Sequence, residues 1–199
     1  MEEMTVISNS NEWRPLLFKI IKTRIATMAS TKAVFIAIGL YLLSIVALKI
    51  SDFQIEKVAP GIPKPDLVFG YTYVDIMEIF SQLGEAGRQA YAINLIVDSV
   101  MPILFAAAVI LVAARAFPRF WLPASIAPFL FFILDMIENA AFAQMVAQFP
   151  NIDPSLVAFT RSLTMIKLIS YMIAMPTLVI GGLIIIIRLI KNRGATGKT

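Results

Sequence analysis

Residues 163–187 read LTMIKLISYMIAMPTLVIGGLIIII, an apolar run with one charged residue, Lys167. About 20 such residues cross the hydrocarbon core of a bilayer as a helix. Three more apolar runs precede this one, at 33–48, 92–114 and 122–147. The first run is shorter, but snorkelling Lys32 and Lys49 at its ends complete a span. With 59% hydrophobic and 15% charged residues, the chain is too apolar for a soluble domain. We therefore predict an all-α, integral membrane four-helix bundle.

The distribution of basic residues predicts how the spans are oriented. We place the four-transmembrane-helix domain at 31–190, with spans at about 31–50, 91–114, 122–147 and 163–188. Eleven of the 17 basic residues lie before span one, between spans two and three, or after span four. The positive-inside rule then makes the segment 1–30 and the tail 191–199 cytoplasmic. A bacterial inner membrane and a eukaryotic endoplasmic reticulum or plasma membrane are equally compatible with this pattern.

Two amphipathic segments outside the spans are predicted to be helical. Within residues 13–27, Trp13, Leu16 and Ile20 share one face, so this N-terminal helix is expected to lie in the membrane interface. In the first outer loop, Thr72 and Asp75 have the spacing of a capping box, and the helix that follows should stop at Gly84. Its apolar residues cover much of its circumference, so we expect it to pack as a lid on the outer end of the bundle. In the second outer loop, Asp153 before Pro154 predicts a helix start.

The composition excludes several classes of chemistry. The chain has no cysteine and no histidine, which removes disulfides, thiolate nucleophiles, iron–sulfur clusters and the commonest metal ligand. We expect neither a cofactor nor a metal. The net charge of +4 reflects topology rather than nucleic-acid binding. The expected partners are membrane lipids and a small apolar or amphipathic ligand, and a homo-oligomer is left open.

Polar residues within the spans are the candidate site, because ionisable groups in a membrane are costly and normally face the bundle interior. Their helical spacing groups them on single faces. By span, they are Arg88, Tyr91, Asn94 and Asp98; Asp135, Glu138 and Asn139; and Lys167 and Tyr171. With the predicted topology all of them fall in the outer half of the membrane. The sequence therefore predicts a one-sided polar pocket beneath the outer-loop helix.

Charge balance suggests what this pocket could do. Three carboxyls face one or two cations, so desolvation and repulsion should keep at least one carboxyl protonated near neutrality. A neutral acid beside an ionised neighbour is suited to acid–base catalysis. We assign catalytic roles to Asp135, Glu138 and Asp98, and ligand-binding roles to Asn139, Lys167, Arg88, Tyr91, Asn94 and Tyr171. The alternative is that these groups only join helices through hydrogen bonds.

The motifs resemble a family of small four-span bacterial and fungal membrane proteins, mostly uncharacterised. The resemblance rests on Gly84-Glu-Ala-Gly87-Arg88-Gln-Ala-Tyr91, then Asp98 and Pro102, then Leu134-Asp135-Met-Ile-Glu138-Asn139, and finally Lys167. It covers roughly residues 70–171 and implies that these polar residues belong together. In overall shape the chain is also similar to the sterol isomerase and sigma-2 receptor family, although it lacks the histidine of that catalytic pattern.

Three functional hypotheses follow. The leading one is a lipid- or isoprenoid-binding protein that acts on its ligand by cofactor-independent isomerisation, cyclisation or epoxide opening. The second is a non-catalytic accessory or assembly subunit of a membrane complex. The third is a proton-coupled carrier, because membrane carboxylates often relay protons; four spans without an internal repeat and an inner half without ionisable groups disfavour it.

Overall fold

The computed structural model describes residues 23, 25 and 27–196, with side chains as far as Asn192. The elements in chain order are α2 (Thr31–Val58), the 3-10 turn η1 (Pro65–Leu67), α3 (Tyr73–Asp98), α4 (Val100–Ala116), α5 (Trp121–Ala124), α6 (Ile126–Gln148) and α7 (Pro154–Thr196). Most of the predicted interfacial helix at 13–27 lies outside the described residues, as do the last residues of the tail.

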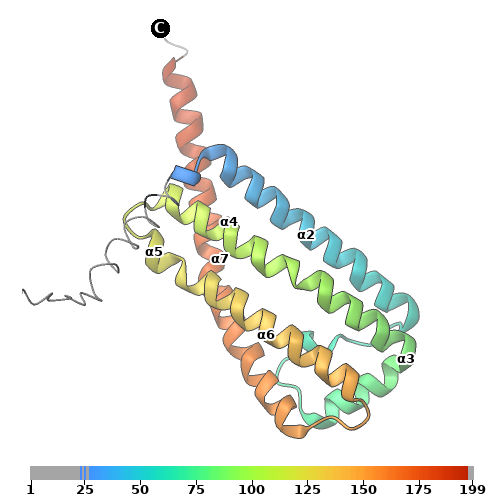
Figure 1. Ribbon diagram of the computed structural model, residues 1–199. Coiled ribbons are helices and arrows are strands. Elements are labelled where there is room, and N and C mark those ends of the chain that lie inside the picture. Colours follow the sequence, from blue (N-terminus) through green and yellow to red (C-terminus); the bar gives the residue numbers. More distant parts are fainter. Residues whose placement is uncertain (1–22, 24, 26, 197–199) are drawn as a thin grey trace, which may run out of the picture.

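Four helical stretches are long and apolar enough to cross a membrane, which confirms the predicted all-α, four-span class. They are Thr31–Val58, Tyr73–Ala116, Trp121–Gln148 and Pro154–Asn192. Large apolar side chains such as Leu43, Ile96 and Ile173 are more than half exposed on the bundle surface, as expected for groups that face lipid. The start of α2 and the end of α7 lie at the same end of the bundle (Figure 1).

The helix starts follow local capping chemistry. The Ser30 hydroxyl accepts a hydrogen bond from the Ala33 amide at the start of α2. The predicted capping box is confirmed: the Asp75 amide donates to Thr72 Oγ1 at 3.3 Å, and the Thr72 amide donates to Asp75 Oδ2 at 2.7 Å. Asp153 precedes Pro154 at the start of α7 as predicted, and its Oδ1 accepts from the Ser155 amide at 2.8 Å.

Two helices differ in length from the predicted spans. The first span was predicted to end at about residue 50, but α2 continues to Val58. Polar residues from Ser51 onward lower the local hydropathy without breaking the helix, and Ile55 anchors this last part in the core. The helix before span two was predicted to stop at Gly84, where the backbone turns sharply (φ 62°, ψ −174°). Helical structure then resumes directly, so α3 already leads into the second span before residue 91.

Prolines place two further breaks. The second span is divided at Ser99, three residues before Pro102, and the third at Ser125, three residues before Pro128. Proline has no backbone N–H, so the carbonyl four residues earlier loses its helical hydrogen bond. The first break leaves Asp98 as the last residue of α3, inside the bundle.

An aromatic layer crosses the middle of the bundle. It takes one ring from each span: Tyr41, Phe105, Phe131 and Tyr171. The Phe105 centroid lies 5.3, 5.2 and 5.0 Å from those of Tyr41, Phe131 and Tyr171 respectively, within the range of favourable ring contacts. This layer separates an apolar half at the end where α2 begins, which includes Val34, Val112 and Ile185, from the polar groups of the other half.

Close contact between α4 and α7 depends on Gly181. A Cβ atom at this position would overlap Val112 Cγ1 and come within 3.2 Å of Phe117 and 3.3 Å of Ala116. The adjacent Gly182 has open space around the same position, with no neighbour within 4 Å. Of the two adjacent glycines, Gly181 alone makes the close contact.

We predict that Gly181→Ala lowers the free energy of unfolding by roughly 1–3 kcal/mol, the usual cost of overpacking a well-packed core. Gly182→Ala is the matched control and should leave stability unchanged or slightly raised, because alanine favours helix more than glycine does. Denaturation of both purified variants in detergent, compared with wild type, measures the difference. Equal stability of the two variants would contradict this account of the α4–α7 contact.

Candidate functional site

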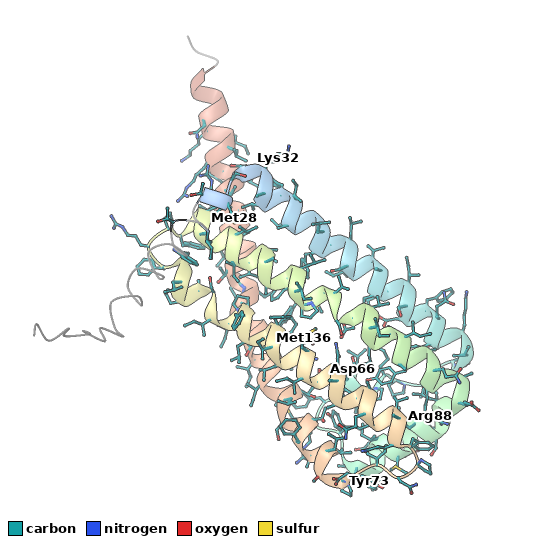
Figure 2. All side chains as sticks on the ribbon, in the orientation of Figure 1. Met28, Lys32, Asp66, Tyr73, Arg88 and Met136 are labelled. Carbon is teal, nitrogen blue, oxygen red and sulfur yellow. The ribbon has the colours of Figure 1, made fainter. Side chains whose placement is uncertain are left out.

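A chamber of about 290 Å³ lies in the half of the bundle on the far side of the aromatic layer from the termini. Every spanning stretch contributes to its lining, and so does the loop between α2 and α3. The lining residues are Leu48, Lys49, Asp52, Lys64, Asp66, Leu67, Asp98, Met101, Phe131, Asp135, Thr164, Lys167, Leu168 and Tyr171. Its volume is close to the lower limit for small-molecule sites. Figure 2 shows Asp66 within this half, opposite the end that carries Lys32.

The first ionic group in the chamber joins α6 to α7. Lys167 Nζ lies 3.0 Å from Asp135 Oδ1 and also forms an ion pair with Glu138. Glu138 is fully buried and accepts a second hydrogen bond, from the hydroxyl of Thr164. The Tyr71 hydroxyl lies 3.3 Å from the same threonine oxygen. These contacts bring together the predicted residues Asp135, Glu138 and Lys167.

The second ionic group joins the outer loop to α2 and α3. Lys64 Nζ lies 2.9 Å from Asp52 Oδ1 and 3.7 Å from Asp66 Oδ2, and it donates to Asn94 Oδ1 at 3.2 Å. The Asn94 amide donates in turn to Asp52. Burial lowers the pKa of Lys64, but the carboxylates of Asp66 and Asp52 outweigh burial, so the net pKa is raised. Lys64 is therefore a permanent cation in this group.

Asp98 lines the chamber, and Asn139 joins it to Asp135 of the first ionic group. The Asn139 amide nitrogen lies 3.2 Å from Asp98 Oδ2 and 3.2 Å from Asp135 Oδ2, and 3.4 Å from Ser99 Oγ. One amide therefore bridges two chamber carboxyls. Among the described residues, no lysine or arginine forms a salt bridge with Asp98. It is thus the carboxyl with the least compensation of charge.

Four predicted ligand-binding residues do not line the chamber. Asn94 and Asn139 belong to the hydrogen-bonded groups described above, whereas Arg88 and Tyr91 contact the scaffold. Arg88 donates to the carbonyl of Phe80 at 2.7 Å and places its guanidinium 4.3 Å from the ring centroid of Phe149. Tyr91 is fully buried and donates to Asp66 Oδ1 at 2.9 Å, so it holds a chamber carboxyl in place.

Besides the exposed Lys49, four polar chamber residues were missed by the sequence analysis. They are Asp52, Lys64, Asp66 and Thr164. The first three lie beyond the predicted end of span one, where charged residues suggest an aqueous loop. The sequence Lys64-Pro65-Asp66 could have indicated that this loop enters the bundle. Its two opposite charges, on either side of a proline, can be buried together as an ion pair. Non-helical backbone at membrane depth is tolerated where it lines a cavity within the protein.

The chamber region carries more acid than base. Its two ionic groups and Asp98 contribute five carboxyls, whereas the lysines that contact them are Lys49, Lys64 and Lys167. Lys49 pairs with Asp52 at 3.2 Å, but its side chain is 73% exposed and is screened by solvent. If all groups are ionised, two carboxylates exceed the number of cations. The chamber is therefore suited to a ligand that carries, or develops, positive charge.

Four apolar spanning helices around a buried Asp, Glu and Lys network define an integral, multi-pass membrane protein. No protein-family model, curated protein or solved structure matches the chain. The fold alone therefore supports only the class of small four-span membrane proteins for this chain. The resemblance based on the Gly84–Tyr91 and Asp135–Asn139 motifs stays a prediction.

We predict that Lys167→Met destabilises the protein by roughly 3–5 kcal/mol, because it leaves Asp135 and Glu138 buried without a cation. Neutralising both acids in the triple variant Lys167→Met, Asp135→Asn, Glu138→Gln should recover most of this loss. Lys49→Met is the control and should cost less than about 1 kcal/mol, as for a surface ion pair. Unfolding in detergent measures all three variants. Similar losses for Lys167→Met and Lys49→Met would show that the buried pair contributes little.

Proposed function

We propose that the chamber binds a small amphipathic molecule of the lipid or isoprenoid type and transforms it by acid–base chemistry without a cofactor. One observation carries the proposal: Asp98 and Asp135 both line the chamber, and the same Asn139 amide nitrogen contacts both. Two carboxyls held in different environments are a recurrent arrangement for an acid and a base.

The chamber walls support a ligand with an apolar body. Leu48, Met101, Phe131 and Leu168 face the same space as the carboxyls. Among the lining residues, Leu67 is 68% exposed and Leu168 is 41% exposed, beside the 73% exposed side chain of Lys49. In a bilayer the apolar part of this rim favours entry of a ligand with an apolar body.

The proposed chemistry balances within the two carboxyls and the ligand. The protonated member of the pair donates a proton to an alkene carbon or an epoxide oxygen, and positive charge develops on the ligand. The ionised member then removes a proton from a carbon next to the cationic centre, which gives an isomer of the ligand. Return of this proton to the first carboxyl restores the starting state. The excess of carboxylates around the chamber stabilises the intervening positive charge. We assign these two roles to Asp98 and Asp135.

Glu138 receives a positioning role in this proposal. It is fully buried, is held by Lys167 and Thr164, and is not among the residues that line the chamber. It fixes Lys167, and Lys167 in turn contacts Asp135. This arrangement keeps the ammonium beside one carboxyl and away from Asp98, so the two chamber carboxyls have unequal proton affinities.

The test compares ligand retention in the wild-type protein and the Asp98→Asn, Asp135→Asn double variant, each extracted with its native lipids and analysed by native mass spectrometry. We expect a small bound molecule in wild type, with at least tenfold lower occupancy in the double variant. Asparagine keeps the shape of aspartate, so a folded variant is expected. Glu85→Gln, an exposed substitution on α3, is the matched control and should retain the ligand.

Two outcomes would overturn the proposal. A wild-type protein that carries no small molecule, and copurifies instead with a stable membrane partner, would favour the accessory-subunit hypothesis. Equal occupancy in wild type and the double variant would mean that the ligand does not use these carboxyls.

We propose further that both ends of the chain are cytoplasmic. In the full sequence, eleven of the 17 lysines and arginines lie before span one, between spans two and three, or after span four, and six lie on the chamber side. A basic end favours the cytoplasmic side. The absence of cysteine from the sequence makes a labelling experiment direct.

Single cysteines at Lys191 and Asn151, both exposed and at opposite ends of the bundle, test the orientation in intact cells. A membrane-impermeant maleimide should label Asn151→Cys before lysis and Lys191→Cys only after lysis. Thermal denaturation confirms that each variant is folded. The reverse labelling pattern would place the chamber on the cytoplasmic side and the basic end outside.

A further inference from the structure

A second cavity, of about 280 Å³, lies at the basic end of the bundle. It is formed where α2 begins, α4 ends and the last turns of α7 pass between them. Its polar lining comes from Thr31, Arg115, Arg188 and Asn192, and its apolar lining comes from Pro118, Ile185 and Leu189. This cavity is separate from the carboxylate chamber, which lies on the other side of the aromatic layer.

The two arginines are held in place by the scaffold. Arg188 Nη1 and Nη2 donate to the carbonyls of Arg115 and Ala116, each at 3.3 Å, and thereby cap the end of α4 from α7. Arg115 Nη2 lies 3.4 Å from the Thr31 hydroxyl. A guanidinium has five N–H donors, so each arginine keeps donors that contact no protein acceptor within the described part of the chain.

Within residues 31–192, no carboxylate balances the charge of these arginines. Between residues 31 and 192, the carboxyl groups lie in the second half of α2, the outer loops, α3 and α6. All the salt bridges that the described residues form involve Lys49, Lys64 or Lys167. Two positive charges thus share one cavity without a carboxylate, which favours an anion of similar size.

The position of the cavity along the bundle identifies the kind of anion. It lies at the end of α4, just before the exposed Phe120 and the buried Trp121, where aromatic residues typically mark the membrane interface. Ile185 and Leu189 continue its wall toward the apolar part of α7.

We propose that this cavity binds the phosphate group of an anionic phospholipid, with both guanidiniums on the phosphate oxygens and the acyl chains along α7. Paired arginines match phosphate geometry, and basic pockets between spans bind such headgroups.

The experiment is native mass spectrometry of the full-length protein, delipidated in detergent and titrated with phosphatidylglycerol or phosphatidylcholine. We expect tighter retention of phosphatidylglycerol, and about fivefold weaker binding in Arg115→Gln, from the contribution of one arginine near a membrane surface. Arg115→Gln removes the contact with Thr31 but leaves the backbone carbonyls that accept from Arg188, so both Arg188 hydrogen bonds remain. Arg161→Gln, an exposed arginine at the chamber end, is the matched control and should bind like wild type.

A parallel titration with inorganic phosphate, read by thermal denaturation, separates the two sources of this chemistry. Stabilisation by phosphatidylglycerol but not by millimolar phosphate supports a lipid headgroup site. Equal stabilisation by both would overturn the lipid assignment, since the acyl chains would then contribute nothing. Equal binding of the two lipids, or of wild type and a folded Arg115→Gln variant, would overturn the site itself.

Discussion

The cost of placing charge inside an apolar bundle is the constraint on which most of this structure depends. Lys167 and Glu138 are buried between α6 and α7, where neither could remain ionised alone. Each therefore needs the other, and the pairing fixes the register of the two helices. Asp135 and Thr164 supply the remaining contacts. The same logic applies to Lys64, which remains paired only if the outer loop enters the bundle and meets Asp52.

The glycine-rich segment before span two makes this entry possible. Gly84 has a positive φ that L side chains rarely adopt, so the chain turns there from the outer helix into the span. Gly87 packs against Ala59 and Leu83, where a Cβ would be tight at 3.0–3.3 Å. Arg88 and Tyr91 then hold Phe80 and Asp66 respectively. The spacing of glycine, arginine and tyrosine in the segment from Gly84 to Tyr91 is therefore explained by the turn at Gly84 and by the contacts that support the chamber.

The sequence predicted the spans and the polar stripes because both depend on local properties. Apolar runs of sufficient length must be helical in a bilayer, and positions such as Asp135 and Asn139 share a face through the helical period alone. The Thr72 capping box is likewise local. The approach of Lys64 and Asp66 to Asp52 was not predictable in this way, because a loop's path depends on tertiary contacts. The hydrogen bond of Arg88 to the Phe80 carbonyl was not predictable either, because this carbonyl becomes available only once Gly84 bends the helix. A ligand-binding role of Arg88 stays a prediction.

The polarity of the two halves bears on the choice among the functional hypotheses. A proton-coupled carrier needs a polar route from one side of the membrane to the other. Here the chamber carboxyls all lie on one side of the layer of Tyr41, Phe105, Phe131 and Tyr171. On the other side, residues 106–114 of α4 and 172–187 of α7 contain no ionisable side chain. Protons exchanged by Asp98 and Asp135 therefore have no evident path inward. The proposed acid–base chemistry needs no proton path across the membrane. It requires only that the ligand enters from the lipid and reaches the carboxyls in one half of the bundle.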